Sequence, residues 1–339
     1  MIHKSIRIAS ARLSSVVALA LFSLSVFQAA AQQQVPAAPA QDSSATAPSE
    51  PAPATAPVFP KPDPANFTAA APTKEAVNAF LQTLWGYDDS RIWQVQAILK
   101  TPVEGISRVY VLVGDKAGKQ KPGPTQFFVL ADGKHIIAGD EILPFGEHLY
   151  ADSRVQLQQR ADGPYRGSAA KELELVEFAD FQCPHCKEAQ ANMDKLIVDF
   201  PKARIVFQVY PLEKIHPAAK TAAEYGVCVT KEGGSNAFFQ YASAVFEGQD
   251  GLATADGATL TLNSAVVKAG LDPAKIATCA ATPAVGAQVD ASVKLAQDLN
   301  INQVPTLMIN GRQVSIGGAS YDVIKQIVQY QAKLDGIAQ

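Results

Sequence analysis

The sequence predicts an α/β domain with a helical insertion, preceded by a smaller α+β domain. Residues 168–339 give the order strand, helix, strand, long helical block, strand hairpin and closing helix. Residues 73–147 instead give one amphipathic helix followed by strands rich in branched and aromatic residues. The chain has 339 residues, 47% of them hydrophobic, which is enough to build at least one sizeable core.

In the smaller domain, we expect one helix packed against an antiparallel sheet. Thr73 is a helix-entry residue, and the apolar residues after it recur at helical spacing. The expected strands span residues 91–99, 106–113 and 125–130, and the Asp132-Gly133 turn leads into a fourth at 134–138.

In the larger domain, a strand at residues 173–178 leads through Cys183 into a helix over 184–200. A second strand follows at 206–209, and residues 217–300 are mostly helical. The end of the chain predicts strands at 306–309 and 313–316, joined by an Asn-Gly turn, and a helix over 321–334. Residues 148–167 are polar, weakly helical and broken by glycine and proline, which is typical of an interdomain linker.

The first 72 residues predict a leader and a tether. Residues 1–31 combine three basic residues, an apolar stretch over 13–27 and three alanines at 29–31, which together indicate a cleaved secretory signal. An uncleaved membrane anchor is the alternative. Residues 32–72 hold 10 of the 22 prolines and 12 alanines, so we expect a disordered linker. The mature protein is therefore expected to be periplasmic or secreted.

Charge and cysteine content exclude several classes of protein. The formal charge of −3 provides no positive field for nucleic acid, and no basic stripe is present, so no nucleic-acid partner is expected. Four cysteines are too few for a disulfide-packed miniprotein. Each cysteine therefore has to be interpreted by its own surroundings.

The strongest chemical signal is the motif Cys183-Pro184-His185-Cys186, placed where a strand ends and a helix begins. At the first turn of a helix, unpaired N–H groups and the helix dipole stabilise a thiolate over a thiol. Pro184 suits the first helical position, and the His185 imidazole can add further stabilisation to the anion. Cys183, at the exposed helix start, is the expected nucleophile, and Cys186, one turn further in, is the expected resolving thiol.

Two other interpretations of this motif are half of a zinc site and an inert disulfide. Zinc needs two more ligands, and the sequence contains neither a second C-x-x-C nor an H-x-x-x-H. We therefore expect a redox-active Cys183–Cys186 disulfide and neither a metal nor an organic cofactor. The remaining cysteines, Cys228 and Cys279, are expected to form a structural disulfide in an oxidising compartment, and two buried free thiols are the alternative.

The motif and its surroundings resemble the DsbA-like branch of the thioredoxin superfamily. The resemblance covers about residues 165–336 and includes Val176 to Cys186, His216-Pro217 and Gln303 to Thr306. It implies a thioredoxin-like fold, a cis peptide before Pro305, and substrate binding along the backbone at Val304 and Pro305. It also implies that Glu177, in an otherwise apolar strand, is a buried acid that relays the proton of Cys186. An exposed glutamate at the edge of the sheet is the alternative for Glu177.

Residues 73–147 are similar to the cystatin-like dimerisation domain that precedes the catalytic domain in DsbC and DsbG disulfide isomerases. The hairpin Ala131 to Gly139, which includes His135, carries this second resemblance. It implies a homodimer formed through residues 73–147.

These two resemblances imply different activities. The Pro184-His185 dipeptide and Val304 favour an oxidase, whereas the order of the domains favours a dimeric isomerase. The expected function is thiol–disulfide exchange with cysteine-containing secreted proteins, with a membrane redox partner that recycles the disulfide. A periplasmic holdase, in which the motif plays no part, is the alternative from another class.

Overall fold

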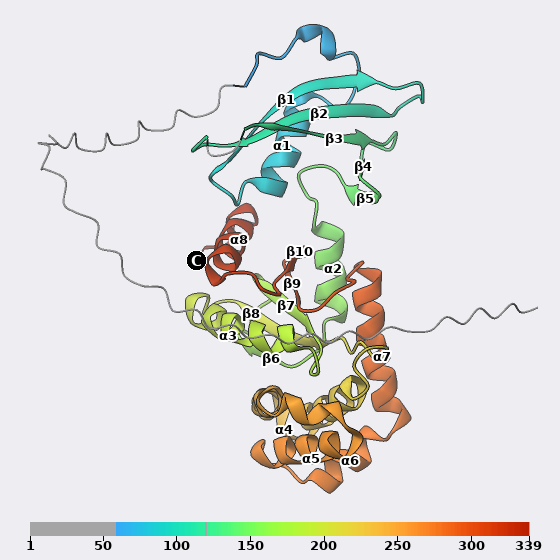
Figure 1. The fold of residues 1–339 in the computed structure, drawn as a ribbon, viewed down its shortest axis with the longest axis vertical. Coiled ribbons are helices and arrows are strands. Elements are labelled where there is room, and N and C mark those ends of the chain that lie inside the picture. Colours follow the sequence, from blue (N-terminus) through green and yellow to red (C-terminus); the bar gives the residue numbers. More distant parts are fainter. Residues whose placement is uncertain (1–58, 119–120, 339) are drawn as a thin grey trace, which may run out of the picture. The chain divides into compact units, whose positions relative to one another are not determined.

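The computed structural model describes residues 59–118 and 121–338 (Figure 1). The expected signal peptide at 1–31 and the first part of the expected linker, residues 32–58, lie outside the described residues. Within the described ranges, no helix combines the length and the apolar character needed to cross a membrane.

The described end of the expected linker, residues 59–72, is ordered, which corrects the prediction of disorder there. A short 3₁₀ helix, η1 (Pro64–Asn66), is followed by Phe67, which bridges to Ile98. The N–H groups of Thr68 and Ala69 both donate to the Ile98 carbonyl, at 3.0 and 3.1 Å. The prolines suggested disorder, but Phe67 and the neighbouring backbone dock this segment against the free edge of a strand.

The first sheet has five antiparallel strands in the order β1-β2-β3-β4-β5. The helix α1 (Lys74–Trp85) begins where the sequence predicts, because the Thr73 hydroxyl accepts a hydrogen bond from the Ala76 N–H at 3.1 Å. The strands are β1 (Arg91–Lys100), β2 (Ser107–Asp115), β3 (Gly123–Val129), β4 (His135–Ala138) and β5 (Glu141–Pro144). The strand β5 was not predicted, since its four residues end in proline. The core of this domain contains Val77, Phe80 and Leu81 of α1 and apolar residues of β1 to β4.

The second sheet has the order β10-β9-β7-β8-β6. Its central strands β7 (Glu174–Ala179) and β8 (Arg204–Val209) are parallel, and β9 (Thr306–Ile309) pairs antiparallel with β7. The edge strands are β10 (Arg312–Ser315) and β6 (Tyr165–Gly167). All six residues of β7 are buried, including its two glutamates, Glu174 and Glu177.

Helices cover both faces of this sheet. One face packs against α3 (Pro184–Asp199) and α8 (Tyr321–Leu334), whose buried residues include Met193 and Ile327. The other face packs against α2 (Ala151–Arg160) and α7 (Pro283–Asp298) through Leu157 and Leu295. This arrangement is the thioredoxin-like α/β fold that the sequence predicted.

A helical insertion lies between β8 and α7. It contains α4 (Ala219–Glu247), interrupted at Gly234, the 3₁₀ helix η2 (Gln249–Ala253), α5 (Ala255–Lys268) and α6 (Pro273–Ala280). The aromatic ring of Phe181, from the loop after β7, packs against Phe207, Phe238, Tyr241 and Phe246. The core of the insertion is therefore continuous with the loop that carries the cysteine motif.

The expected linker at 148–167 is only partly correct, because most of it is folded. Helix α2 packs Leu157 into the core of the second sheet, and β6 pairs antiparallel with β8. Its composition is polar because α2 buries only one residue and β6 is a three-residue edge strand.

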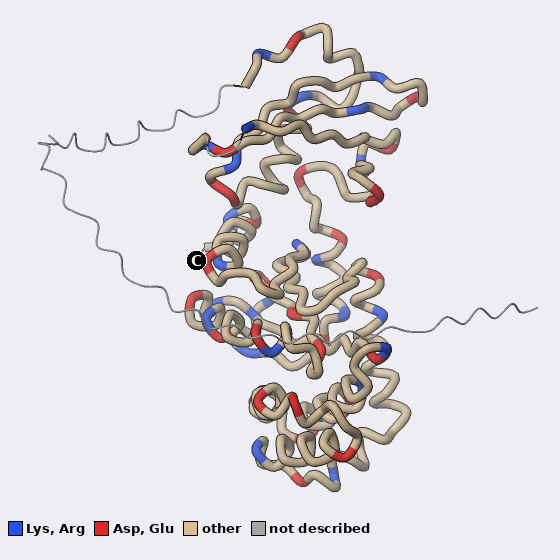
Figure 2. The backbone as a smooth tube through the Cα atoms, in the orientation of Figure 1, with Lys and Arg blue, Asp and Glu red and all other residues tan. Residues whose placement is uncertain are grey.

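Basic and acidic residues are interspersed over the described chain rather than gathered in blocks of one sign (Figure 2).

Candidate active site

The cysteine motif forms the first turn of helix α3. Cys183 is the N-cap residue, with extended backbone angles, and Pro184 occupies the first helical turn. The Cys183 carbonyl accepts hydrogen bonds from the N–H groups of Cys186 and Lys187, at 3.1 and 3.2 Å. Pro184 has no N–H, so it leaves no unpaired donor at this position. The sequence thus places Cys183 at the positive end of the helix dipole.

Both thiols are free in the structure, which therefore describes the reduced dithiol. Cys186 is fully buried at 0% exposure, and Cys183 is 6% exposed. The expectation that Cys183 lies exposed is therefore wrong, because the insertion and the loop around Val304 pack over the helix start. Cys183 remains the more accessible of the two sulfur-bearing residues.

The surroundings of the two thiols shift their pKa values in opposite directions. The pKa of Cys183 is lowered to about 6, chiefly by the hydrogen bond from the Cys186 side chain and further by the backbone N–H groups of Cys186 and His185. Burial and the Asp180 carboxylate act in the opposite direction. The pKa of Cys186 is raised, first by burial and then by its hydrogen bond to Cys183. At neutral pH, Cys183 is therefore the thiolate and Cys186 the thiol.

The His185 side chain does not stabilise the Cys183 thiolate in the way the sequence suggested. Its ring nitrogen Nδ1 lies 3.1 Å from Oε2 of Glu188, and its side chain is 65% exposed. His185 stabilises the thiolate through its backbone N–H instead. The partner Glu188 lies one helical turn further along α3, and its competition for the imidazole was not considered from the sequence.

Val304 and Pro305 lie beside the candidate nucleophile. The Val304–Pro305 peptide is cis, as the resemblance implied. The Sγ atom of Cys183 lies 4.0 Å from the Val304 carbonyl oxygen. The backbone before Pro305 is thus brought to the sulfur although 121 residues separate Cys183 from Val304.

Glu177 is buried in strand β7, at 2% exposure, so the alternative of an exposed edge glutamate is wrong. Burial raises the pKa of its carboxyl to about 7, and a hydrogen bond from Gln190 partly opposes that shift. The Gln190 Nε2 donates both to Glu177 Oε1, at 2.8 Å, and to the Cys186 carbonyl, at 3.1 Å. The Gln190 amide therefore links the buried Glu177 carboxyl to Cys186, the residue whose proton Glu177 was expected to relay.

Three polar side chains at the site were not identified from the sequence. Gln249, in η2, is buried and donates to the carbonyls of Phe181 and Cys183, at 2.9 and 3.0 Å. Gln182 bonds the insertion at the Leu252 carbonyl and the Ala218 N–H. Asp180 is buried and contacts His216. Polar residues next to the motif in an otherwise apolar stretch were the available signal for Gln182 and Asp180, whereas nothing local marks Gln249.

Cys228 and Cys279 form a disulfide across the insertion. Cys228 lies in α4 and is fully buried, and Cys279 lies in α6. The two residues are 51 positions apart, and their pairing is the one expected from the sequence. This bond ties α4 to α6 in the same apolar core that contacts the active-site cysteines.

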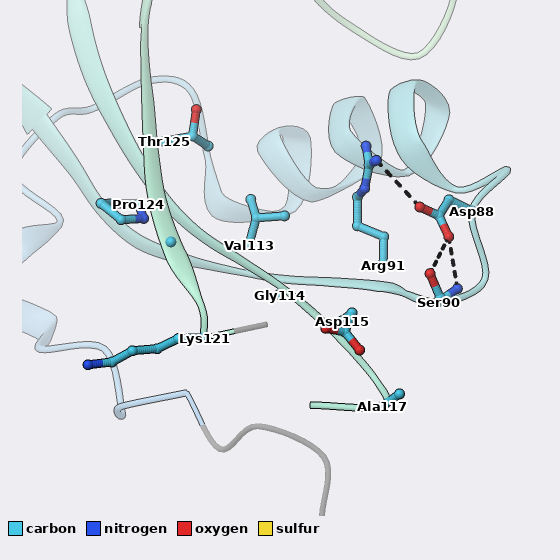
Figure 3. A pocket seen from close by; sticks show the side chains of 11 residues that line it. Asp88, Ser90, Arg91, Val113, Gly114, Asp115, Ala117, Lys121, Pro124 and Thr125 are labelled. Atoms are coloured by element: carbon cyan, nitrogen blue, oxygen red, sulfur yellow. Dashed lines mark hydrogen bonds and ion pairs between the residues drawn. The ribbon is translucent and has the colours of Figure 1, made fainter. Parts of the chain in front are cut away.

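A separate pocket of about 640 Å³ lies at the strand ends of the first sheet. Arg91, Asp88 and Ser90 line it, together with strand and loop residues of β2 and β3 (Figure 3). The Asp88 carboxylate pairs with Arg91 at 3.4 Å and accepts the Ser90 hydroxyl at 2.6 Å. Asp88, Arg91 and Ser90 therefore bond to one another, and the lining of the pocket includes none of the residues of the cysteine site.

The chain belongs to the thioredoxin family, whose family model matches residues 159–329. Among curated proteins it is similar to the Na(+)/H(+) antiporter NhaA 3 of Salinispora tropica, with 29% identity over 148 residues. It is also similar to the Na(+)/H(+) antiporter NhaA 1 of Mycolicibacterium vanbaalenii, with 30% identity over 149 residues. The matches cover 44% and 43% of this chain, and the chain spans only 22% and 23% of the length of those relatives.

Solved structures similar to this chain include a thioredoxin-like oxidoreductase from Silicibacter pomeroyi, at 23% identity and a TM-score of 0.45. The match covers 53% of this chain and 98% of that one. The thiol-disulfide exchange protein alpha-DsbA2 from Wolbachia pipientis is 21% identical, with a TM-score of 0.45, and the match covers 53% of this chain and 96% of that one.

Proposed function

We propose that this protein is an extracytoplasmic thiol–disulfide oxidoreductase in which Cys183 exchanges disulfides with substrate proteins, and we favour an oxidase. The observation that carries the proposal is the contrast between the two thiols of one motif. Cys183 has a pKa lowered to about 6 at a helix N-terminus, whereas the pKa of its neighbour Cys186 is raised by burial. A stabilised thiolate is a good leaving group, so the mixed disulfide between Cys183 and a substrate gives up Cys183 readily. The reduced protein is favoured, which makes the Cys183–Cys186 disulfide oxidising.

The proposed reaction starts from the oxidised protein. A substrate thiolate attacks Sγ of Cys183, the Cys183–Cys186 bond breaks, and Cys186 leaves as a thiolate. A second substrate thiolate then attacks the substrate sulfur of the mixed disulfide, and Cys183 leaves as a thiolate. The substrate loses two electrons and gains a disulfide, and the protein gains the two electrons as a dithiol. The Cys183–Cys186 pair is sufficient for this exchange, so the proposal includes neither a metal nor an organic cofactor.

Glu177 is proposed to supply the proton that the leaving Cys186 sulfur takes up. Its pKa of about 7 means that both of its protonation states are populated near neutral pH, as a proton relay requires. Gln190 holds its carboxyl while bonding the Cys186 carbonyl. The raised pKa of Cys186 makes protonation of the leaving thiolate favourable.

The proposed substrates are cysteine-containing secreted proteins in an extended conformation. The Val304 backbone lies 4.0 Å from the Cys183 sulfur, where an extended chain can bind while its own sulfur reaches Cys183. The reduced protein then needs a disulfide donor, which we propose is a membrane redox partner. The Cys228–Cys279 disulfide supports an oxidising compartment, periplasmic or secreted.

A dimeric isomerase is the second candidate, and the α+β domain at the start of the described chain favours it. That domain has its own sheet and its own core, as a module that pairs two chains requires. Under this candidate, residues 73–147 form a homodimer. Sedimentation of the full mature chain measures the oligomeric state directly.

The test of the proposed function is stoichiometric oxidation of a reduced dithiol peptide by the purified, oxidised protein. One equivalent of protein is expected to oxidise one equivalent of peptide. Failure of the wild-type protein to do so contradicts the proposal. The reduction potential tests the preference for an oxidase: a value near the strongly oxidising end, about −120 mV, supports it, and one near about −270 mV indicates a reductase instead. Refolding of a scrambled multi-disulfide substrate separates the oxidase from the isomerase.

A further inference from the structure

Asp180 places a buried carboxylate directly behind the cysteine motif. It follows the last residue of β7 and precedes Cys183 by three positions. Its side chain has 0% exposure. A carboxylate removed from water is costly unless hydrogen bonds and an opposite charge compensate it. The partners of Asp180 therefore determine how much of its negative charge acts on its surroundings.

Three groups contact the Asp180 carboxylate. Its Oδ1 accepts the Gln182 N–H at 2.7 Å, and its Oδ2 accepts the Leu212 N–H at 2.8 Å. The Nδ1 of His216 lies 2.9 Å from the same Oδ2. Among the described residues, His216 is the only group bonded to this carboxylate that can carry a positive charge. The His216 side chain is itself mostly buried, at 17% exposure.

The backbone of Asp180 is bonded to both active-site cysteines. Its N–H donates to the Cys186 sulfur at 3.4 Å, and its carbonyl accepts the Cys183 N–H at 3.1 Å. The pKa of Cys183 is lowered chiefly by the Cys186 hydrogen bond, and the negative charge of Asp180 opposes this lowering. The interaction of a buried charge with its surroundings is little screened by salt.

We propose that His216 is a positioning residue that acts through Asp180, offsetting the carboxylate charge that disfavours the Cys183 thiolate. This inference deepens the proposed function and rests on it, because it concerns the reactivity of the same sulfur. His216 reaches the site from the segment that connects β8 to α4, so the insertion contributes an electrostatic element as well as apolar packing.

The two members of this pair predict effects of opposite sign. Removing His216, which is a positive partner when it is protonated, leaves the Asp180 charge offset only by the two backbone N–H groups, so Cys183 becomes harder to ionise and the disulfide less oxidising. Removing the carboxylate has the reverse effect. If the pair only held the loop in place, both changes would loosen the same contact and shift the thiolate in the same direction.

The experiment follows the thiolate absorbance at 240 nm across a pH titration of the reduced, full mature chain. His216→Gln is expected to raise the midpoint by about half a unit, a roughly threefold loss of the thiolate-to-thiol ratio at a given pH. Asp180→Asn is expected to lower it by a similar amount. His216→Lys keeps a positive charge and should stay near the wild-type midpoint.

The matched control is His135→Gln. His135 forms the same type of contact, with Nδ1 2.6 Å from Asp132 Oδ2, but it is 47% exposed and lies in the first sheet. It should leave the midpoint unchanged. The equilibrium constant for oxidation of glutathione by the Cys183–Cys186 disulfide should rank the variants in the same way: the higher the midpoint of thiolate formation, the less oxidising the disulfide.

Equal midpoints for His216→Gln and His216→Lys would overturn the inference, as would shifts of the same sign for His216→Gln and Asp180→Asn. If Asp180→Asn does not fold, the comparison of glutamine with lysine at position 216 still decides. The titration needs no substrate, so it can fail while wild-type exchange is intact. An inactive wild-type protein with the expected shifts would count against the proposed function alone.

Discussion

The chain contains two cysteine pairs in one continuous apolar core, and their surroundings differ. Cys183 and Cys186 are three positions apart at the start of a helix, where backbone N–H groups face a sulfur. Cys228 and Cys279 are 51 positions apart and join two helices of the insertion. The first pair is stabilised in its reduced form by the hydrogen bond between its own two sulfurs and by backbone N–H groups of the helix start, whereas no backbone hydrogen bond to the sulfurs of the second pair is seen among the described residues. Burial alone therefore does not separate a reactive pair from a structural one.

The largest expected effect comes from removing the sulfur of Cys183. Cys183→Ser should abolish oxidation of a dithiol peptide, since the Cys183 sulfur is the disulfide atom that is attacked and that later leaves as a thiolate. Cys186→Ser, the matched change in the same pair, should instead accumulate a mixed disulfide when it is incubated with a disulfide-bonded substrate, because Cys183 can attack that disulfide and no Cys186 thiol is left to release the product. The mixed disulfide is visible on a non-reducing gel. If Cys183→Ser still oxidised the peptide, the assignment of Cys183–Cys186 as the reactive pair and Cys228–Cys279 as the structural pair would be contradicted.

The structural pair should show the opposite behaviour. Replacing both Cys228 and Cys279 by alanine should lower the free energy of unfolding by about 4 kcal/mol on the chain-entropy estimate for a loop of this length. Peptide oxidation below the unfolding transition should stay close to wild type. Urea denaturation measures the first effect and the peptide assay the second. If the double variant keeps full stability but loses exchange, the roles assigned to the pairs are wrong.

Glu177 gives the reactive pair a pH dependence that the structural pair lacks. Its pKa of about 7 lies above the ordinary carboxyl value, so the folded chain holds one proton more than the unfolded chain between about pH 4.5 and 7. Stability should therefore fall as the pH rises through this window and level off above it, by about 3 kcal/mol in total.

The measurement is urea denaturation at pH 5 and pH 8 on the oxidised protein, in which neither active-site cysteine titrates. Glu177→Gln keeps the hydrogen-bonding shape and should remove this part of the pH dependence. Glu188→Gln, on the exposed face of α3, is the control and should retain it. Identical pH profiles for wild type and Glu177→Gln would mean that the buried carboxyl does not titrate in this range.

The smallest effect is expected for Gln249, which supports the reactive pair from the insertion. Gln249→Met removes two buried hydrogen bonds, to the Phe181 and Cys183 carbonyls, and should cost about 1 to 3 kcal/mol of stability. Gln313→Met, on the exposed side of β10, is the matched control and should cost little. Thermal unfolding of both variants measures the difference. Equal costs would show that Gln249 does not hold the helix start.

Local sequence signals predicted much of the fold and the central part of the site. The helix over 321–334 and the strand over 306–309 match because their apolar periods are clear and each ends at a turn signal. The motif at Cys183 is readable because four adjacent residues carry the chemistry. Residues 59–72 were misjudged because proline content indicates local stiffness but not the neighbouring strand edge that accepts the segment.

The remaining features of the site depend on contacts between distant parts of the chain. Gln249 reaches the Cys183 carbonyl from 66 residues away, and His216 reaches Asp180 from 36 residues away. Neither distance can be inferred from spacing along one sequence. The pairing of His185 with Glu188 is local in the sequence. The sequence does not decide, however, whether the His185 imidazole approaches the Glu188 carboxylate or the Cys183 sulfur.

The central claim is that Cys183 is held as an anion at the start of helix α3. Titration of the reduced protein by thiolate absorbance, with Cys228 and Cys279 kept in their disulfide, measures this most directly. The account predicts one thiolate appearing with a midpoint near pH 6, and no second one below about pH 9. A single midpoint near the ordinary thiol value of about 8.5 would contradict it.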